Sequence, residues 1–269
     1  MQYEFVWITT KDDLDLYGMM TPEKNKRVLI NIHGTASNFY EEDFIDNFAK
    51  ELPKIGVSLL TVNNRGAYVM ESYQNSGAAV EKFEDCIIDI DEWIEFALKK
   101  GFKEIILSGH SLGTEKVVYY MENGKYADKV VGIVLLAPAD SYGSHRLHGG
   151  KLNIETKKRV DLLLKESERL IKEGKGDTLL TRYAYGSHTG IMPKTAESFI
   201  NFLGPKSKLI EGLPFVTGKL DNYSKIRCPI LVIIGDGNEY TGISIKDTLK
   251  LMQKENKLTE EVTSFIKKI

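Results

Sequence analysis

A serine between two glycines has the clearest chemical potential in this sequence. Gly109, Ser111 and Gly113 lie in the pattern Gly-His-Ser-Leu-Gly, which follows an aliphatic run and precedes a helix-like stretch. A sharp strand-to-helix turn exposes such a serine, and the flanking glycines leave room for the turn. Because the sequence predicts a strand at 104–109 and a helix at 112–123, we expect Ser111 to be a nucleophile rather than a capping serine in an ordinary turn.

A second loop carries residues suited to binding the oxyanion that forms when a serine attacks an ester. His33, Gly34 and Thr35 end an earlier buried strand. In folds with this kind of serine turn, a backbone N–H from that loop acts together with the N–H of the residue after the serine. We therefore expect Thr35 and Leu112 to be the oxyanion donors, and we expect His33 to hold the loop in place rather than to act as the base.

The elements that would hold these residues alternate between short strands and amphipathic helices, which is typical of a largely parallel sheet. The stretches 3–10 and 14–20 alternate apolar and polar residues and predict an opening antiparallel hairpin. The continuous apolar run at 27–34 indicates a strand buried on both faces. Further strands are expected at 57–66, 104–109, 130–139 and 228–237, and helices at 41–55, 82–101, 112–123 and from 244 to the end of the sequence.

The regular alternation stops between 141 and 226, where polar and aromatic segments surround a charged helix at 155–174. A segment of this length is too long for an ordinary connection and is typical of a functional insertion. We therefore predict a core formed by 1–140 and 227–269, with an inserted lid or cap at 141–226.

Five segments give the sequence a resemblance to the α/β-hydrolases: INIHGTAS, VNNRGAYVMES, IILSGHSLGTEK, VVGIVLLAPAD and PILVIIGDGNEY, in this order. The resemblance covers about residues 1–256 and is most similar to a group of serine esterases and lipase-like hydrolases that includes siderophore esterases. It implies an α/β-hydrolase fold, with a mostly parallel sheet flanked by helices and an inserted helical lid. It also implies cleavage of a carboxylic ester through an acyl-enzyme on Ser111.

The resemblance further implies where the triad acid lies, and the sequence departs from the pattern there. Related chains typically read Gly-X-X-Asp after this strand, but the third residue beyond Gly235 is Asn238. An amide accepts a hydrogen bond from an imidazole without stabilising its charge, and this replacement costs a serine protease about four orders of magnitude in turnover. Three acidic residues are the alternatives: Asp236, Glu239 and Asp140.

The triad base should be a histidine that follows the acid and a last strand. The sequence has five histidines and none after position 188: His33, His110, His145, His148 and His188. Since the residues after 244 predict a helix, we expect the final strand and its histidine to be missing together, as in a truncated enzyme. In the lid, His145 and His188 are expected to contact the substrate.

A serine without a general base is a weak nucleophile at neutral pH. Three interpretations therefore stay open, namely a truncated enzyme, a relocated triad, and a degenerate hydrolase fold kept for binding. The last defines a rival function, a non-catalytic ligand-binding protein. A further variant is acyl transfer, which differs from hydrolysis in whether the lid excludes water.

Composition argues against several other classes. The chain of 269 residues has 36 Lys and Arg against 38 Asp and Glu, so its formal charge of −2 gives no electrostatic reason for binding nucleic acid or an anionic membrane. Cys86 and Cys228 are too far apart in sequence to indicate a disulfide framework. His145 and His148 lack the accompanying carboxylates or cysteines of a metal site. We expect neither a metal nor a cofactor.

The expected setting is cytoplasmic. No apolar run approaches the ~18 residues that a membrane span requires, and the first residues lack the apolar region of a secretory signal. The expected partner is a small-molecule ester substrate, and composition does not indicate an oligomeric state.

Overall fold

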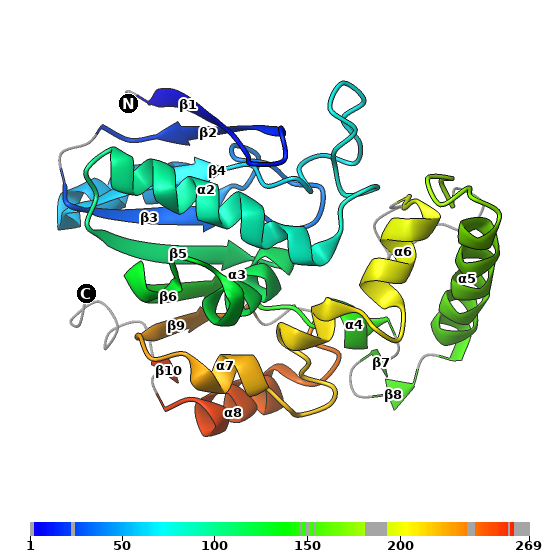
Figure 1. Cartoon of the computed structure of the whole chain (residues 1–269). Helices are drawn as coiled ribbons and strands as arrows, with labels where there is room; N and C mark the ends of the chain where they lie inside the picture. The colour runs from blue at the N-terminus through cyan, green and yellow to red at the C-terminus, as the bar shows by residue number, and fades with distance from the viewer. Residues whose placement is uncertain are drawn as a thin grey trace.

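A sheet forms the middle of the molecule, with helices on both of its faces (Figure 1). This computed structural model describes residues 3–22, 25–145, 147–148, 151–152, 154–180, 193–235, 240–257 and 259–260. Eight strands of these residues pair in the order β1 (Glu4–Thr9), β2 (Asp15–Met20), β4 (Val57–Val62), β3 (Arg27–Ile32), β5 (Glu104–His110), β6 (Val130–Leu136), β9 (Ile230–Ile233) and β10 (Thr259–Glu260).

The sheet is mostly parallel. β1 pairs with β2 and β2 with β4 in antiparallel fashion, whereas every pair from β4 to β10 is parallel. All six residues of β4 are buried, as a strand covered on both faces requires. The edge strand β1 instead alternates in burial because only one of its faces meets the core. These features confirm the predicted α/β-hydrolase architecture.

Helices α2 (Cys86–Lys99), α3 (Leu112–Asn123), α7 (Asp221–Lys225) and α8 (Ile245–Glu255) contribute to one core, and α1 (Phe44–Glu51) contributes to the other. Strand β3 shows how one sequence serves both cores. Ile30 packs with α2 and α3, while its neighbour Leu29 packs with α1, because successive side chains of a strand point to opposite faces. The predicted hairpin, the helix at 112–123 and the strands around them are confirmed.

The C-terminal region corrects one prediction. A helix was expected from 244 to the end of the sequence, but α8 ends at Glu255 and β10 begins at Thr259, parallel to β9. The cause is Asn256, whose side-chain amide donates to the carbonyl of Tyr223 at 2.8 Å and of Ile226 at 3.1 Å. These bonds hold Asn256 in an extended conformation, so the chain turns into the sheet. The expectation that this last strand is missing is therefore wrong.

The inserted segment contains α4 (Ser141–Ser144), β7 (Leu147–His148), β8 (Lys151–Leu152), α5 (Ile154–Lys172) and α6 (Ala196–Leu203). Helices α5 and α6 lie beyond the carboxyl ends of the parallel strands (Figure 1). They share an apolar cluster that includes Leu163 and Phe199, whereas Phe215 and Tyr223 belong to the main core of the sheet. Within the residues described, no helix combines the length and apolar character needed to cross a membrane.

Candidate active site

Ser111 occupies a strained turn between β5 and α3. Its backbone has φ 51° and ψ −122°, a conformation that costs a residue with a Cβ about 1–3 kcal/mol. Neighbouring groups hold it there. The Ser111 N–H donates to the carbonyl of Leu136 at 3.0 Å, and its own carbonyl accepts from the Thr114 N–H at 2.9 Å and hydroxyl at 2.6 Å. The geometry is that of a nucleophile turn.

The glycines on each side of Ser111 are required by close backbone contacts. A Cβ at Gly109 would lie 2.4 Å from the carbonyl oxygen of Gly113. A Cβ at Gly113 would lie 2.2 Å from the carbonyl oxygen of Ile32. Both distances are far shorter than van der Waals contact, so the crossing of β5, α3 and β3 excludes any larger residue at either position.

The loop after β3 lies against the Ser111 side chain. A Cβ at Gly34 would lie 2.9 Å from Ser111 Cβ and 3.4 Å from its Oγ. The next residue, Thr35, is exposed, and Leu112 begins α3 as a buried residue. Within the part of the chain that the structure describes, neither the Thr35 nor the Leu112 backbone N–H donates to another protein group. Both predicted oxyanion donors thus belong to segments in contact with Ser111 and have no protein acceptor of their own.

His33 holds this loop in place. It is fully buried, with Nδ1 2.7 Å from the carbonyl oxygen of Gly34, and Nε2 accepts from the backbone N–H of Asn64 at 3.1 Å. Burial lowers the pKa of His33 to about 4, so the imidazole is neutral at pH 7. Since both ring nitrogens are engaged, His33 has the expected scaffolding role and does not serve as a base.

His110 precedes the serine but its ring is directed to other groups. Its Nδ1 lies 3.0 Å from a carboxylate oxygen of Glu42, and its ring packs edge-on against Phe44 of α1, 5.4 Å between centroids. Partial burial acts to raise the pKa of Glu42, but His110 and the Ser37 hydroxyl bind the carboxylate and lower the pKa overall. His110 therefore ties the elbow to the segment that leads into α1.

The candidate acids differ in what the structure says of them. Asp140 follows β6 and is buried, and its carboxylate accepts from the N–H groups of Gly143 at 2.6 Å and Val216 at 2.9 Å. It therefore caps α4 and joins it to a distant segment. The other candidates lie outside the described residues: Asp236, Asn238 and Glu239.

The remaining histidines belong to the inserted segment. His145 is the half-buried residue that ends α4, and His148 lies in β7. His188 lies outside the described residues. Of the imidazoles that can be described, none is hydrogen-bonded to Ser111 Oγ. The described site therefore contains a nucleophile turn and two free oxyanion donors.

Two buried charged residues of α3 were not predicted as part of the site. The Glu115 carboxylate accepts from the backbone N–H and the hydroxyl of Ser141, and burial raises its pKa well above the usual range. The Lys116 ammonium group donates to the Asn64 side chain and to the Glu81 carboxylate, each at 2.8 Å. In the sequence, this Glu-Lys pair after the elbow resembles a solvated helix face, so no local signal indicates its burial.

Solved structures with this arrangement define the class. The esterase Pf2001 of Pyrococcus furiosus is 17% identical with a TM-score of 0.56, covering 97% of this chain and 80% of the esterase. Est1E of Butyrivibrio proteoclasticus, solved with ferulic acid, is 16% identical with a TM-score of 0.61, covering 96% and 88%. The α/β hydrolase GrgF of a Penicillium species is 14% identical with a TM-score of 0.65, covering 97% and 88%. The protein has the α/β-hydrolase fold.

Within this class the chain belongs to the family described as protein of unknown function DUF1749, which it matches over residues 9–265. A UPF0613 protein of Schizosaccharomyces pombe is 22% identical over 188 residues. That match covers 68% of this chain and 55% of the yeast protein, so the chain spans about half the length of this curated relative.

Proposed function

We propose that the protein is a serine hydrolase that cleaves a small-molecule carboxylic ester through an acyl-enzyme on Ser111. The observation that carries the proposal is the positive φ of Ser111 between β5 and α3, with Gly34 packed against its side chain. Strain of this kind persists where surrounding contacts enforce it, and it gathers at functional sites. It exposes one hydroxyl beside two N–H groups that lack protein acceptors.

In the proposed reaction Ser111 Oγ attacks the ester carbonyl carbon and loses its proton to a general base. The carbonyl electron pair moves onto oxygen, and the N–H groups of Thr35 and Leu112 bind that oxyanion. Collapse of the tetrahedral intermediate expels the alcohol, which takes up a proton, and leaves Ser111 acylated. Attack by water then releases the carboxylic acid and restores the hydroxyl.

The proposal assigns the base to neither histidine near the elbow. His33 has both ring nitrogens bound, and His110 faces Glu42. Asp140 is the candidate acid within the described residues, because it follows β6 at the edge of the sheet that carries Ser111. The loop that follows β9 supplies Asp236, Asn238 and Glu239 as the alternatives.

We further propose that 141–226 acts as a lid over this site. The support is the position of α5 and α6 beyond the carboxyl ends of the parallel strands, where ligands of open α/β sheets bind. In this proposal His145 and His188 contact the substrate.

Labelling with a fluorophosphonate tests the proposal. The probe should attach to Ser111, as peptide mass spectrometry would show, and Ser111→Ala should remove both the label and the turnover of p-nitrophenyl butyrate. A folded protein that takes no label and releases no p-nitrophenol from short esters would rule the proposal out.

The second candidate function is non-catalytic ligand binding on the same fold. It is favoured by one observation, that no imidazole of the described residues is hydrogen-bonded to Ser111 Oγ. It predicts that p-nitrophenyl butyrate binds without release of p-nitrophenol, and that Ser111→Ala leaves the affinity within about twofold. Release of one equivalent of p-nitrophenol by the wild type would exclude it.

A further inference from the structure

A buried ion pair stands directly behind the elbow. Lys116 lies one turn after Leu112 in α3, and its side chain is 1% exposed. Its ammonium group donates to Oε2 of Glu81, whose side chain is 0% exposed, and to Oδ1 of Asn64, each at 2.8 Å. The pair therefore binds the helix that carries the Leu112 N–H to a residue of the loop after β4.

From Asn64 the contacts continue to the oxyanion loop. The Asn64 backbone N–H donates to Nε2 of His33 at 3.1 Å, and its side-chain amide donates to the His33 carbonyl at 3.3 Å. His33 in turn contacts the carbonyl of Gly34 through Nδ1 at 2.7 Å. Two residues thus separate the Lys116 ammonium group from the segment that carries the Thr35 N–H.

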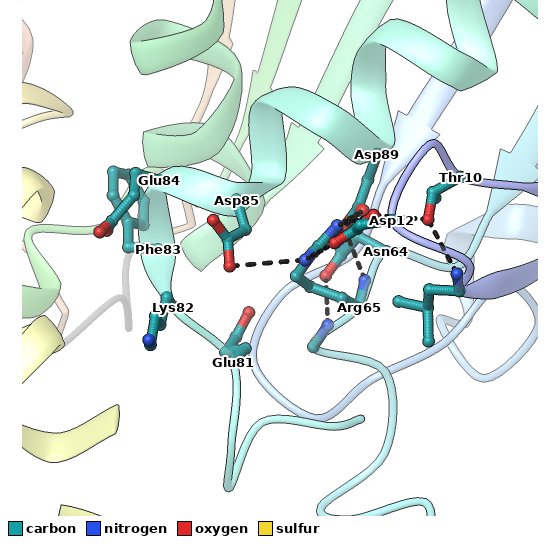
Figure 2. Close-up of polar contacts among 12 residues, drawn as sticks. Thr10, Asp12, Asn64, Arg65, Glu81, Lys82, Phe83, Glu84, Asp85 and Asp89 are labelled. Atoms are coloured by element: carbon teal, nitrogen blue, oxygen red, sulfur yellow. Dashed lines mark hydrogen bonds and ion pairs between the residues drawn. The ribbon is translucent and has the colours of Figure 1, made fainter. Parts of the chain in front are cut away.

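Asn64 is itself held firmly, which lets it transmit a position. Figure 2 shows the neighbouring Arg65 between three carboxylates. The guanidinium lies 2.8 Å from Asp89, 2.9 Å from Asp12 and 3.4 Å from Asp85. The Asn64 side chain also accepts from the Gly66 N–H at 3.0 Å. The loop is therefore fixed from both sides of Asn64.

Stability alone does not account for the ion pair. A buried pair seldom stabilises a protein more than apolar residues of the same volume, because both charges lose their hydration. The backbone nevertheless makes room for it, since a Cβ at Gly66 would lie 2.3 Å from Glu81 Oε2. What the pair does provide is a fixed distance between α3 and the loop at Asn64.

We propose that Lys116 is a positioning residue that sets the spacing of the two oxyanion donors. Leu112 and Lys116 share one helix, so the position of the ammonium group fixes the position of the Leu112 N–H. The chain of contacts through Asn64 and His33 fixes the loop that bears Thr35. This inference rests on the proposed function, because it assigns a role within the same oxyanion site.

The test uses Lys116→Met combined with Glu81→Gln, which leaves no unpaired charge in the interior. The double variant should react with the fluorophosphonate about 10- to 100-fold more slowly, a part of the 10²–10³ that one oxyanion donor is worth. If the protein turns over p-nitrophenyl butyrate, kcat should fall and KM should stay within about threefold. Amide hydrogen exchange in 33–38 should become at least about tenfold faster, a change that a purely structural role elsewhere would not produce.

The matched control is Lys82→Met, which removes an exposed lysine that lies 3.8 Å from Glu197; its labelling and exchange should equal those of the wild type. If the double variant does not fold, Lys116→Gln with Glu81→Gln keeps hydrogen-bonding groups without charge and takes its place. A folded double variant with wild-type labelling and exchange would overturn the inference. If the wild type takes no label, the proposed function fails, and the exchange of 33–38 still decides the role of Lys116.

Discussion

Two buried lysines lie near the segment 78–84, and they are held in different ways. Lys116 donates to a carboxylate and an amide oxygen. Lys194 donates instead to the carbonyl of Ala78 at 2.7 Å and to the hydroxyl of Ser198 at 3.2 Å, and it lies 3.6 Å from the centre of the Phe202 ring. Burial lowers the pKa of Lys194 to about 8, although the charge of Glu81 opposes this.

The difference follows the two regions that these residues join. Lys116 connects elements around the elbow, where an opposite charge balances it. Lys194 attaches α6 of the inserted segment, and its neighbours bind through neutral contacts, such as Thr195 N–H to the Ala79 carbonyl at 2.8 Å and the Ser198 hydroxyl to the Glu81 carbonyl at 2.7 Å. The elbow region is therefore tied by a charge pair, and the attachment of α6 by neutral groups around a costly cation.

The largest expected effect comes from breaking the charge pair on one side only. Lys116→Met leaves the Glu81 carboxylate buried without its partner, which should lower the free energy of unfolding by about 3–5 kcal/mol. Urea unfolding at pH 7 measures this. The double variant with Glu81→Gln should recover most of the loss, and a single variant that loses under 1 kcal/mol would show that water reaches this carboxylate.

The elbow region should also weaken in acid through His33. Its pKa is about 4 in the folded protein and about 6.5 when unfolded. The unfolded chain binds more protons between these values, so stability is complete above pH 6.5 and is lost as the pH falls towards 4, by up to about 3 kcal/mol. Urea unfolding at pH 7, 5.5 and 4 would show this slope.

The control for the acid effect is His33→Gln, whose side chain does not titrate. This variant should be less stable at pH 7 but should lose less stability between pH 6.5 and 4 than the wild type. Parallel curves for the two proteins would assign the acid sensitivity to other groups.

The attachment of α6 should respond at alkaline pH. Lys194 has a pKa of about 8 in the folded protein and about 10.5 when unfolded, so the unfolded chain again binds more protons between these values. Its burial therefore destabilises the fold at pH 7, and this cost disappears as the pH rises from 8 to 10.5. The gain is at most about 3 kcal/mol.

The matched variant is Lys194→Met. Because other lysines and tyrosines also titrate in this range, the quantity to follow is the difference in unfolding free energy between wild type and variant at pH 7, 8.5 and 10. That difference should move in favour of the wild type as the pH rises. A constant difference would mean that Lys194 keeps its charge, as a lysine with a carboxylate partner would.

The sequence predicted the sheet, the elbow and the helix at 112–123 because these depend on local pattern. Buried strands such as 27–34 are continuous apolar runs, and the glycines beside Ser111 indicate a close crossing. The position of His33 was also predictable, since a histidine before a glycine at the end of a strand has the loop backbone within reach.

Features that depend on distant partners could not be predicted. Glu115 and Lys116 look like solvated helix residues, and their burial depends on Ser141 and Glu81, which lie 26 and 35 residues away. Likewise, the residues after Glu255 retain the composition of a helix. The chain leaves the helix there because Asn256 binds carbonyls about 30 residues earlier. The candidate acids and the base fall in irregular segments, where pattern carries little information.

Ser111 gives the smallest expected effect and extends the comparison, because its cost lies in the backbone rather than in burial. At φ 51° and ψ −122° a glycine avoids the strain that a Cβ causes, and the relief outweighs the larger entropy of glycine in the unfolded chain. Ser111→Gly should therefore be about 1 kcal/mol more stable than Ser111→Ala, which keeps the Cβ and is the matched control. Urea midpoints of the two variants at pH 7 give the difference. Equal midpoints would mean that the surrounding contacts, and not the side chain at 111, carry the strain of the elbow.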